Sequence, residues 1–302
     1  MHDYRTSWLR VDLLCGAATQ RVLSHAVRPY VTTVMQTGVA DGWHFERLRQ
    51  GKVLRIHFRG NHGFINELLC DNAREHFSNY FEHDPIFEAQ TEAGVIDCKV
   101  EIDPAQSSLA VYLADRFHYA LSDLLLGETE PNALPTVGDL HTIAIQLHLS
   151  TVHALQWSRR DAAAHFRTLL RATQRERGHF HNRTFRQALD REMREVHAFV
   201  NAYWDRLDNR SIGTVPEPFR DWSRLIEAMD RAYRNDPQLA QQPLLDFWQP
   251  LLRRISNCLG IFGKNEQYLL FQLTESLSKE HVPAPPKEPQ RSLAQRIFQW
   301  VG

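Results

Sequence analysis

The sequence predicts an α+β protein, in which an antiparallel sheet with helices on one face is followed by a mainly helical part. Short segments with period-two hydrophobicity alternate with amphipathic segments in the first third of the chain. From Leu109 onward, helical spacing of apolar residues continues through most of the chain. The 302 residues are 43% hydrophobic and 24% charged, so the chain has a globular composition and can bury a sizeable core.

The chain is expected to begin with a strand and a long helix. The strand is predicted over Ser7–Leu14, where apolar residues recur with period two. The helix is predicted over Thr19–Met35, and Gly38 is its expected stop, because glycine readily adopts the left-handed conformation that ends many helices.

A hairpin, a second helix and a fourth strand are expected next. Trp43–Arg49 and Lys52–Arg59 are rich in aromatic and β-branched residues, and Gln50–Gly51 between them fits a tight turn. A helix over about Phe64–Phe81 and a strand over Gly94–Ile102 follow. The resulting order βαββαβ is the ferredoxin-like arrangement, with helices on one face of an antiparallel sheet.

The rest of the chain is expected to be an assembly of helices. Helical spacing occurs at about Leu109–Leu126, Val137–Trp157, Arg160–Arg175, Phe185–Leu207, Trp222–Tyr233, Pro243–Leu259 and Asn265–Leu277. Pro131–Pro135 and Gly213–Pro218 interrupt this pattern and are expected to be loops between helices.

These elements suggest three parts. We expect a ferredoxin-like α+β part over residues 1–105 and a helical part packed on it over residues 106–280. Residues 281–302 begin with His281–Pro289, whose four prolines predict an extended linker, and they end in a short helix over Leu293–Val301.

Composition excludes several classes of partner. A net charge of −1 and a pI near 7.0 lack the electrostatic field that most nucleic-acid binders use, so nucleic acid is not an expected partner. No run of about 18 or more apolar residues occurs, and Met1–Arg10 has neither the apolar core nor the small-residue cleavage site of a signal peptide. We therefore expect a cytoplasmic protein with no membrane partner.

No motif predicts a metal or an organic cofactor. The four cysteines lie far apart without zinc-binding or redox spacing, which favours reduced, packed thiols: Cys15, Cys70, Cys98 and Cys258. His141, His148 and His153 lie on one predicted helix, but no carboxylate completes a zinc motif, so they are expected to be satisfied by neighbouring groups. The chain has no glycine-rich loop that would cradle a phosphate.

The richest segment for chemistry is the second hairpin strand, Val53–Gly60. Strand alternation places Arg55, His57 and Arg59 on one face and apolar residues on the other. Neighbouring cations on a sheet repel one another, so such a row could hold an anion or polarise a carbonyl group. The alternative is a solvated edge strand that charge protects against aggregation. Periodicity alone leaves both interpretations open.

Several segments carry a resemblance to a known family. Trp43–Arg47 and Leu54–Gly60 resemble the "WFFIRY" and "HLRLRFRG" strands of the thiopeptide-type bacteriocin biosynthesis domain. Trp8–Leu14 precedes these two strands, in the order of segments expected for the family. Near the end of the chain, Ser256–Ile261, followed by Glu266, is similar to the family's "HLNRLGI…E" segment. That domain is the C-terminal elimination domain of lantibiotic dehydratases, and it also occurs as free-standing thiopeptide enzymes.

The resemblance covers about residues 8–277, and three segments depart from the eliminating members. His57 replaces the second arginine of an arginine pair, Asp103–Ser108 stands where an "ERYGG" segment is expected, and Arg253–Ile255 stands where histidines are expected. The elimination machinery is therefore largely absent. A free-standing chain with these departures resembles the macrocyclising [4+2] cycloaddition enzymes of thiopeptide pathways.

The resemblance implies a reaction between two dehydroalanines of a ribosomally made precursor peptide, which carries a leader and a dehydrated, azole-bearing core. The product would be a pyridine or dihydropyridine macrocycle, with loss of the leader where the reaction completes. Pathway dehydratases would be further partners. The candidate catalytic residues are Arg55, His57 and Arg47, and the candidate substrate-binding residues are Trp43, Phe45, Arg59 and Asn257.

A donor such as Arg55 would favour the iminol form of the reacting amide, and His57 would shuttle protons, because histidine titrates near neutral pH. The leader is expected to contact the arginine-rich run Arg171–Arg186 or an exposed edge of the sheet. Two alternatives stay open. One is a split dehydratase subunit that eliminates glutamate from glutamylated Ser or Thr, and the other is a non-catalytic module that binds a precursor peptide.

Overall fold

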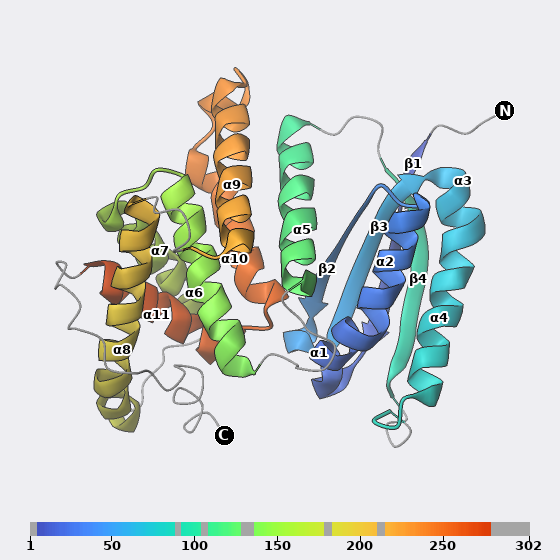
Figure 1. The fold of residues 1–302 in the computed structure, drawn as a ribbon, viewed down its shortest axis with the longest axis horizontal. Helices are drawn as coiled ribbons and strands as arrows, with labels where there is room; N and C mark the ends of the chain where they lie inside the picture. Colours follow the sequence, from blue (N-terminus) through green and yellow to red (C-terminus); the bar gives the residue numbers. More distant parts are fainter. Residues whose placement is uncertain are drawn as a thin grey trace. The chain divides into compact units, whose positions relative to one another are not determined.

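The computed structural model describes residues 5–87, 92–103, 108–127, 136–177, 183–209 and 215–278 (Figure 1). Within the chain, residues 1–134 and residues 135–302 form two compact units. The expected linker over His281–Pro289 and the expected helix over Leu293–Val301 lie outside the described residues.

The first unit contains a four-stranded antiparallel sheet with the strand order β2-β3-β1-β4. Its strands are β1 (Thr6–Leu14), β2 (Gly42–Leu48), β3 (Val53–Asn61) and β4 (Gly94–Ile102). This order and the helices between the strands confirm the predicted ferredoxin-like βαββαβ arrangement. Strands β1 and β3 are central, so each of their side chains lies between the side chains of two neighbouring strands.

One face of the sheet forms the apolar core of this unit. In the register of β1 and β3, Leu9 lies opposite Phe58 and Val11 lies opposite Ile56, and all four are fully buried. The helices on this face complete the core, since the ring of Tyr30 lies 5.7 Å from the ring of Phe58. Each fully buried aliphatic or aromatic side chain contributes about 1.5 to 3 kcal/mol.

Two helical segments cover this face, and each contains one π-helical turn. Leu23–Val27 joins α1 (Thr19–Val22) to α2 (Arg28–Thr37), and Ile65–Leu69 joins α3 (His62–Phe64) to α4 (Cys70–His83). Gly38 has a φ of 69° and its backbone N–H donates to the carbonyl of Met35, so it ends α2 as expected. Hydrophobic spacing predicted both helices but not the π turns, because one inserted residue barely changes the apolar pattern.

Helix α5 (Leu109–Gly127) belongs to the first unit. It contacts β2, where Nε1 of Trp43 donates to Oδ1 of Asp123 at 2.7 Å. The sequence suggested a division near residue 105, whereas the structure groups α5 with the sheet in residues 1–134. Apolar periodicity identifies a helix but does not reveal which neighbour covers its apolar face.

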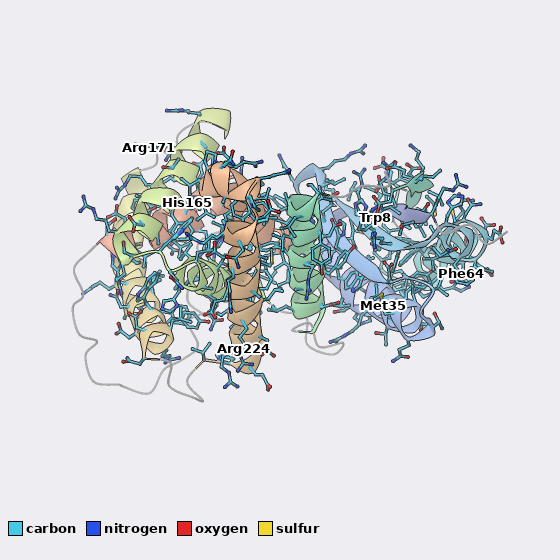
Figure 2. All side chains as sticks on the ribbon, turned by 90° about the horizontal axis from the view of Figure 1, so that it is seen from above. Trp8, Met35, Phe64, His165, Arg171 and Arg224 are labelled. Atoms are coloured by element: carbon cyan, nitrogen blue, oxygen red, sulfur yellow. The ribbon has the colours of Figure 1, made fainter. Side chains whose placement is uncertain are left out.

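The second unit is helical throughout its described part, as predicted. Its helices are α6 (Val137–Ala154), α7 (Arg159–Arg177), α8 (Arg183–Asp208), α9 (Glu217–Asn235), α10 (Leu244–Cys258) and α11 (Lys264–Ser278). Helix α11 packs against α7 and α8, and α6 packs against α9. Figure 2 shows His165 within this unit, where it is buried, and the exposed side chains of Arg171 and Arg224 on its outside. None of the helices in the described ranges is long and apolar enough to cross a membrane.

Candidate functional site

The face of the sheet opposite the core carries charged side chains from three strands. Arg55 on β3 lies opposite Asp12 on β1 and opposite Glu46 on β2. Its Nε and Nη2 atoms donate to the two carboxylate oxygens of Asp12 at 2.7 and 2.8 Å, and its Nη1 lies 3.8 Å from Oε1 of Glu46. Cross-strand neighbours therefore orient this guanidinium through a bidentate pair.

This arrangement changes the interpretation of the cationic row. Acids from neighbouring strands lie between the cations, which a single strand cannot reveal. At the other end of the row, Nε of Arg59 lies 3.1 Å from Oδ2 of Asp103, and its Nη1 lies 3.4 Å from Oδ2 of Asp41. The face is a network of paired charges, rather than a row of uncompensated cations.

A pair of stacked imidazoles lies at the centre of the polar face. The rings of His44 on β2 and His57 on β3 are 4.4 Å apart and nearly parallel, and the two residues are cross-strand partners. Nε2 of His57 lies 3.4 Å from Oε1 of Glu46. The ring of Trp8 meets His44 edge-on at 5.4 Å and His57 at 6.1 Å. The imidazole of His57 thus lies between an aromatic wall and a carboxylate.

Helix α5 contributes further groups to this face that the sequence did not single out. The ring of Tyr119 stacks on His44 at 6.1 Å, and His118 lies 5.2 Å from the same ring. Burial raises the pKa of Asp115, one turn before Tyr119, to about 6, against the lowering effect of nearby Arg59. Polar residues spaced four apart within an otherwise apolar helix are the sequence signal that could have indicated them.

The structure brings together only some of the predicted site residues. Arg55, His57 and Arg59 share the polar face of β3. The other three hairpin candidates point to the opposite face of β2 and are at most 7% exposed: Trp43, Phe45 and Arg47. Nη2 of Arg47 donates to Oε1 of Gln20 on α1 at 2.7 Å. Arg47 lies opposite Leu54, whose side chain faces the core, whereas Arg55 and His57 are on the polar face. Because successive side chains of a strand point to opposite faces, Arg47 is separated from Arg55 and His57.

The last candidate, Asn257, lies at the end of α10 in the second unit. Its carbonyl accepts a hydrogen bond from the backbone N–H of Gly260 at 2.9 Å. Nearby, Nε of Arg253 lies 4.0 Å from Oε1 of the buried Glu266. This ion pair joins Glu266, which belongs to the segment that resembles the family's "HLNRLGI…E" stretch, to Arg253, which lies in a segment that departs from the eliminating members.

Each of the three histidines of α6 has a side-chain partner for Nε2 within the second unit, whereas Nδ1 of the buried His148 has no hydrogen-bond partner in the described part of the chain. Their partners are Gln272 for His141 at 2.6 Å, Ser256 for His148 at 3.2 Å and Asp208 for His153 at 3.0 Å. Burial lowers the pKa of His148 to about 3, so this imidazole is neutral near pH 7. Across the described residues, no group of three His, Cys, Asp or Glu side chains is placed to hold a metal ion.

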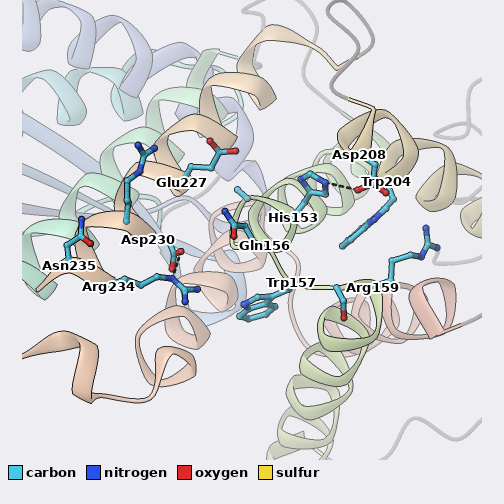
Figure 3. Close-up of a pocket in the computed structure, with 13 residues that line it drawn as sticks. His153, Gln156, Trp157, Arg159, Trp204, Asp208, Glu227, Asp230, Arg234 and Asn235 are labelled. Carbon is cyan, nitrogen blue, oxygen red and sulfur yellow. Dashed lines mark hydrogen bonds and ion pairs between the residues drawn. The ribbon is translucent and has the colours of Figure 1, made fainter. Parts of the chain in front are cut away.

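The second unit also contains a pocket of about 680 Å³, shown in Figure 3. Trp157 and Trp204 are among its lining residues, and the guanidinium of Arg159 lies 5.6 Å from the Trp204 ring. An ion pair of 2.6 Å joins Arg234 to Asp230 at the wall. The size suits a small ligand or one to two residues of a peptide, and the lining is mixed in charge.

A family model described as "Lantibiotic biosynthesis dehydratase C-term" matches residues 8–276. The chain belongs to this family. The match includes both units and confirms the predicted resemblance. No curated protein matches the sequence significantly.

Three solved structures have a similar fold, and their alignments cover about nine-tenths of this chain. The pyridine synthase TbtD from thiomuracin biosynthesis is 17% identical, with a TM-score of 0.63, and the alignment covers 90% of this chain and 97% of that chain. TsrL is 12% identical, with a TM-score of 0.62 and coverages of 90% and 94%. The tRNA-dependent lantibiotic dehydratase MibB from Microbispora sp. 107891 is 16% identical, with a TM-score of 0.57. That alignment covers 89% of this chain and 28% of the MibB chain. At these identities the likeness concerns the fold.

Proposed function

We propose that this family member acts in the biosynthesis of a ribosomally made thiopeptide, as an enzyme that joins two dehydroalanines by a formal [4+2] aza-cycloaddition. The observation that carries the proposal is the structural alignment with the pyridine synthase. It covers 90% of this chain and 97% of that chain, so the two folds correspond over nearly their whole lengths. The departures from the eliminating members at His57 and at Arg253–Ile255 support it.

In the proposed reaction, the amide that precedes one dehydroalanine tautomerises to an iminol, so that its proton moves from nitrogen to oxygen. The resulting aza-diene adds to the second dehydroalanine. One carbon–carbon bond joins the two methylene carbons, and the other joins the iminol carbon to the α-carbon of the second dehydroalanine. Water then leaves with the former amide oxygen. Loss of the leader as an amide, with a proton from a ring carbon, yields the pyridine.

The polar face of the sheet offers groups for these steps. Asp12 occupies Nε and Nη2 of Arg55, which leaves further N–H groups of the guanidinium for the amide oxygen of the substrate. His57 can pass a proton between the substrate and Glu46, whose carboxylate lies 3.4 Å away. Positioning of the two dehydroalanines would supply much of the acceleration, on the order of 7 to 11 kcal/mol.

The remaining candidates receive supporting roles in this proposal. Trp43 and Phe45 hold α5 against β2 through hydrogen bonds to Asp123 and Ser122, so they would shape the site without touching the substrate. Arg47 lies on the opposite face of β2, so it would affect the polar face only indirectly, by holding the backbone of this strand in place. Arg59 and Asn257 keep their proposed contacts with the peptide.

The leader of the precursor would be held by one of two surfaces. On the edge strand β4, Ile96 and Ile102 are 49% and 52% exposed, which suits addition of an extended peptide strand. The alternative is the basic side of α7 around Arg171. The rest of the arginine-rich run, from residue 176 to residue 186, carries side chains outside the described set.

The test is mass spectrometry of a dehydrated, azole-bearing precursor incubated with the protein. A product that has lost water and the leader peptide is expected. A control precursor with alanine in place of the second dehydroalanine should stay unchanged, because it lacks the alkene. An intact precursor after incubation with folded protein would overturn the cyclase assignment.

Glutamate elimination is the second candidate, and the shared fold with MibB favours it. Arg55 is the retained member of the family's arginine pair. A precursor carrying glutamylated serine separates the two candidates, since elimination would release glutamate and leave dehydroalanine. We expect no release, because the three segments typical of eliminating members differ.

A further inference from the structure

Two cysteines that are distant in the sequence meet between helix α4 and strand β4. Sγ of Cys70, the first residue of α4, lies 3.5 Å from Sγ of Cys98 on β4. The thiol of Cys98 also points at the carbonyl of Cys70, 3.4 Å away. Figure 1 shows the two elements side by side, and they are in contact. Both residues are free cysteines of intermediate exposure.

The separation is close to that of a bond-forming pair. A disulfide requires about 2.05 Å between sulfur atoms, so the two thiols would have to approach by roughly 1.5 Å. Both cysteines lie beside a backbone irregularity that can absorb such a movement. The π turn Ile65–Leu69 lies directly before Cys70. The pairing of β1 with β4 shifts register between Asp12 and Leu13, and Asp12 lies opposite Asp97, the residue next to Cys98.

The other two cysteines provide an internal comparison. Cys15 is fully buried and Cys258 is 2% exposed, so a reagent in solution cannot reach them in the folded protein. The thiol of Cys98 already donates to the carbonyl of Cys70, and burial raises its pKa to about 12, so Cys98 is the thiol that is held in its protonated form. Arg74 on α4 and Asp97 on β4 are the charged groups that act on the Cys98 thiol.

We propose that Cys70 and Cys98 form an oxidation site, in which a low-molecular-weight disulfide converts the two thiols into an intramolecular disulfide. The thiolate of Cys70 attacks the reagent and releases one small thiol. The thiolate of Cys98 then attacks Sγ of Cys70 in the mixed disulfide and releases the second small thiol. The two protein thiols lose two protons and two electrons, and the reagent gains them. The bond would anchor α4 to the sheet.

The experiment treats the full-length protein with oxidised glutathione, blocks the remaining thiols, and maps peptides by mass spectrometry. The expected result is a cross-linked peptide pair containing Cys70 and Cys98, while Cys15 and Cys258 are blocked only after unfolding. A denaturation midpoint that rises on oxidation and returns with a reducing agent should accompany it.

Two variants make the outcome decisive. Cys98→Ser should stop at a stable glutathione adduct on Cys70, and Cys70→Ser should resist modification at Cys98. A lasting glutathione adduct on wild-type Cys70, without closure, would overturn the proposal, and so would cross-links to Cys15 or Cys258. Neither readout uses ring formation, so the result is independent of the proposed enzymatic activity.

Discussion

Arg55 and His57 share one carboxylate partner on the polar face of the sheet. Oε1 of Glu46 lies 3.8 Å from Nη1 of Arg55 and 3.4 Å from Nε2 of His57. Asp12 holds the opposite side of the guanidinium, and its side chain is only 11% exposed. A substitution at Arg55 therefore removes a donor and also leaves a largely buried carboxylate without its cation.

Arg55→Ala is expected to slow ring formation by roughly 10²-fold and to lower stability by about 1 to 3 kcal/mol. The double variant Asp12→Asn/Arg55→Ala separates the two effects, because it removes the uncompensated carboxylate. Thermal melting should show recovered stability, while mass-spectrometric rates stay low. A double variant that cyclises at the wild-type rate would remove Arg55 from the mechanism.

His57→Ala should also slow ring formation by roughly 10²-fold, while affinity for the leader changes by at most a few fold. The reason is that His57 is assigned to proton transfer and not to leader binding. Arg59→Ala is the comparison and should slow the reaction less, since Asp103 and Asp41 already pair with that guanidinium. Equal, unchanged rates in both folded variants would place the chemistry elsewhere.

Asp115 gives the first unit a pH-dependent contribution to stability. Because its pKa is raised from 3.8 to about 6, chiefly by burial, the folded state binds its proton more tightly than the unfolded state. The stabilisation is complete below pH 3.8 and is lost as the pH rises through about 6. Asp115→Asn should thus be more stable than the wild type at pH 8, by about 1 to 2 kcal/mol after solvent screening, and this advantage should vanish near pH 4. Denaturant midpoints at the two pH values measure it, and a pH-independent difference would contradict the assignment.

At the scale of elements, α5 and β2 depend on a close approach at one glycine. A Cβ atom on Gly42 would lie 2.6 Å from ring carbons of Tyr119 and 2.8 Å from its hydroxyl. Such distances do not occur between packed atoms, so the absent side chain lets α5 lie against the strand. The same contact places the ring of Tyr119 beside that of His44.

Gly42→Ala is expected to destabilise the protein by about 1 to 3 kcal/mol, because the helix or the tyrosine must move. Gly127→Ala at the end of α5 is the matched control and should be nearly neutral, since no atom lies within 4 Å of the place that a Cβ would take there. Adding Tyr119→Ala to Gly42→Ala should remove the clash, so the effects of the two substitutions should not be additive in denaturation measurements. Strict additivity would argue against this contact.

At the scale of the whole molecule, the family match spans both units, and a catalyst that works by positioning should draw binding energy from remote parts of its substrate. The leader is the remote part in the proposed reaction. An exposed basic helix face and an exposed strand edge are the surfaces assigned to it, and they differ in their response to charge and salt.

The leader peptide alone, without a reactive core, is expected to bind in calorimetry more tightly than a scrambled leader. If α7 holds an acidic leader, Arg171→Glu should weaken binding by roughly tenfold, and the effect should shrink at high salt. Arg224→Glu on the outside of α9 is the matched control and should have little effect. Binding that is unchanged in both variants would favour strand addition at β4, and no preference over the scrambled leader would count against leader-guided catalysis.

Much of the fold could be predicted from local patterns, because alternation and helical spacing directly report which side chains are buried. They predicted the four strands, the ferredoxin-like order and the helical second unit, and they placed Arg55, His57 and Arg59 on one face. Only the tertiary structure decided which groups meet across strands and helices. It pairs Arg55 with Asp12, stacks His57 on His44, turns Arg47 to the opposite face and adds Tyr119 from α5. The physical reason is that a one-dimensional pattern fixes the direction of a side chain, whereas charge compensation and ring stacking depend on strand register and helix docking, which bring distant residues together.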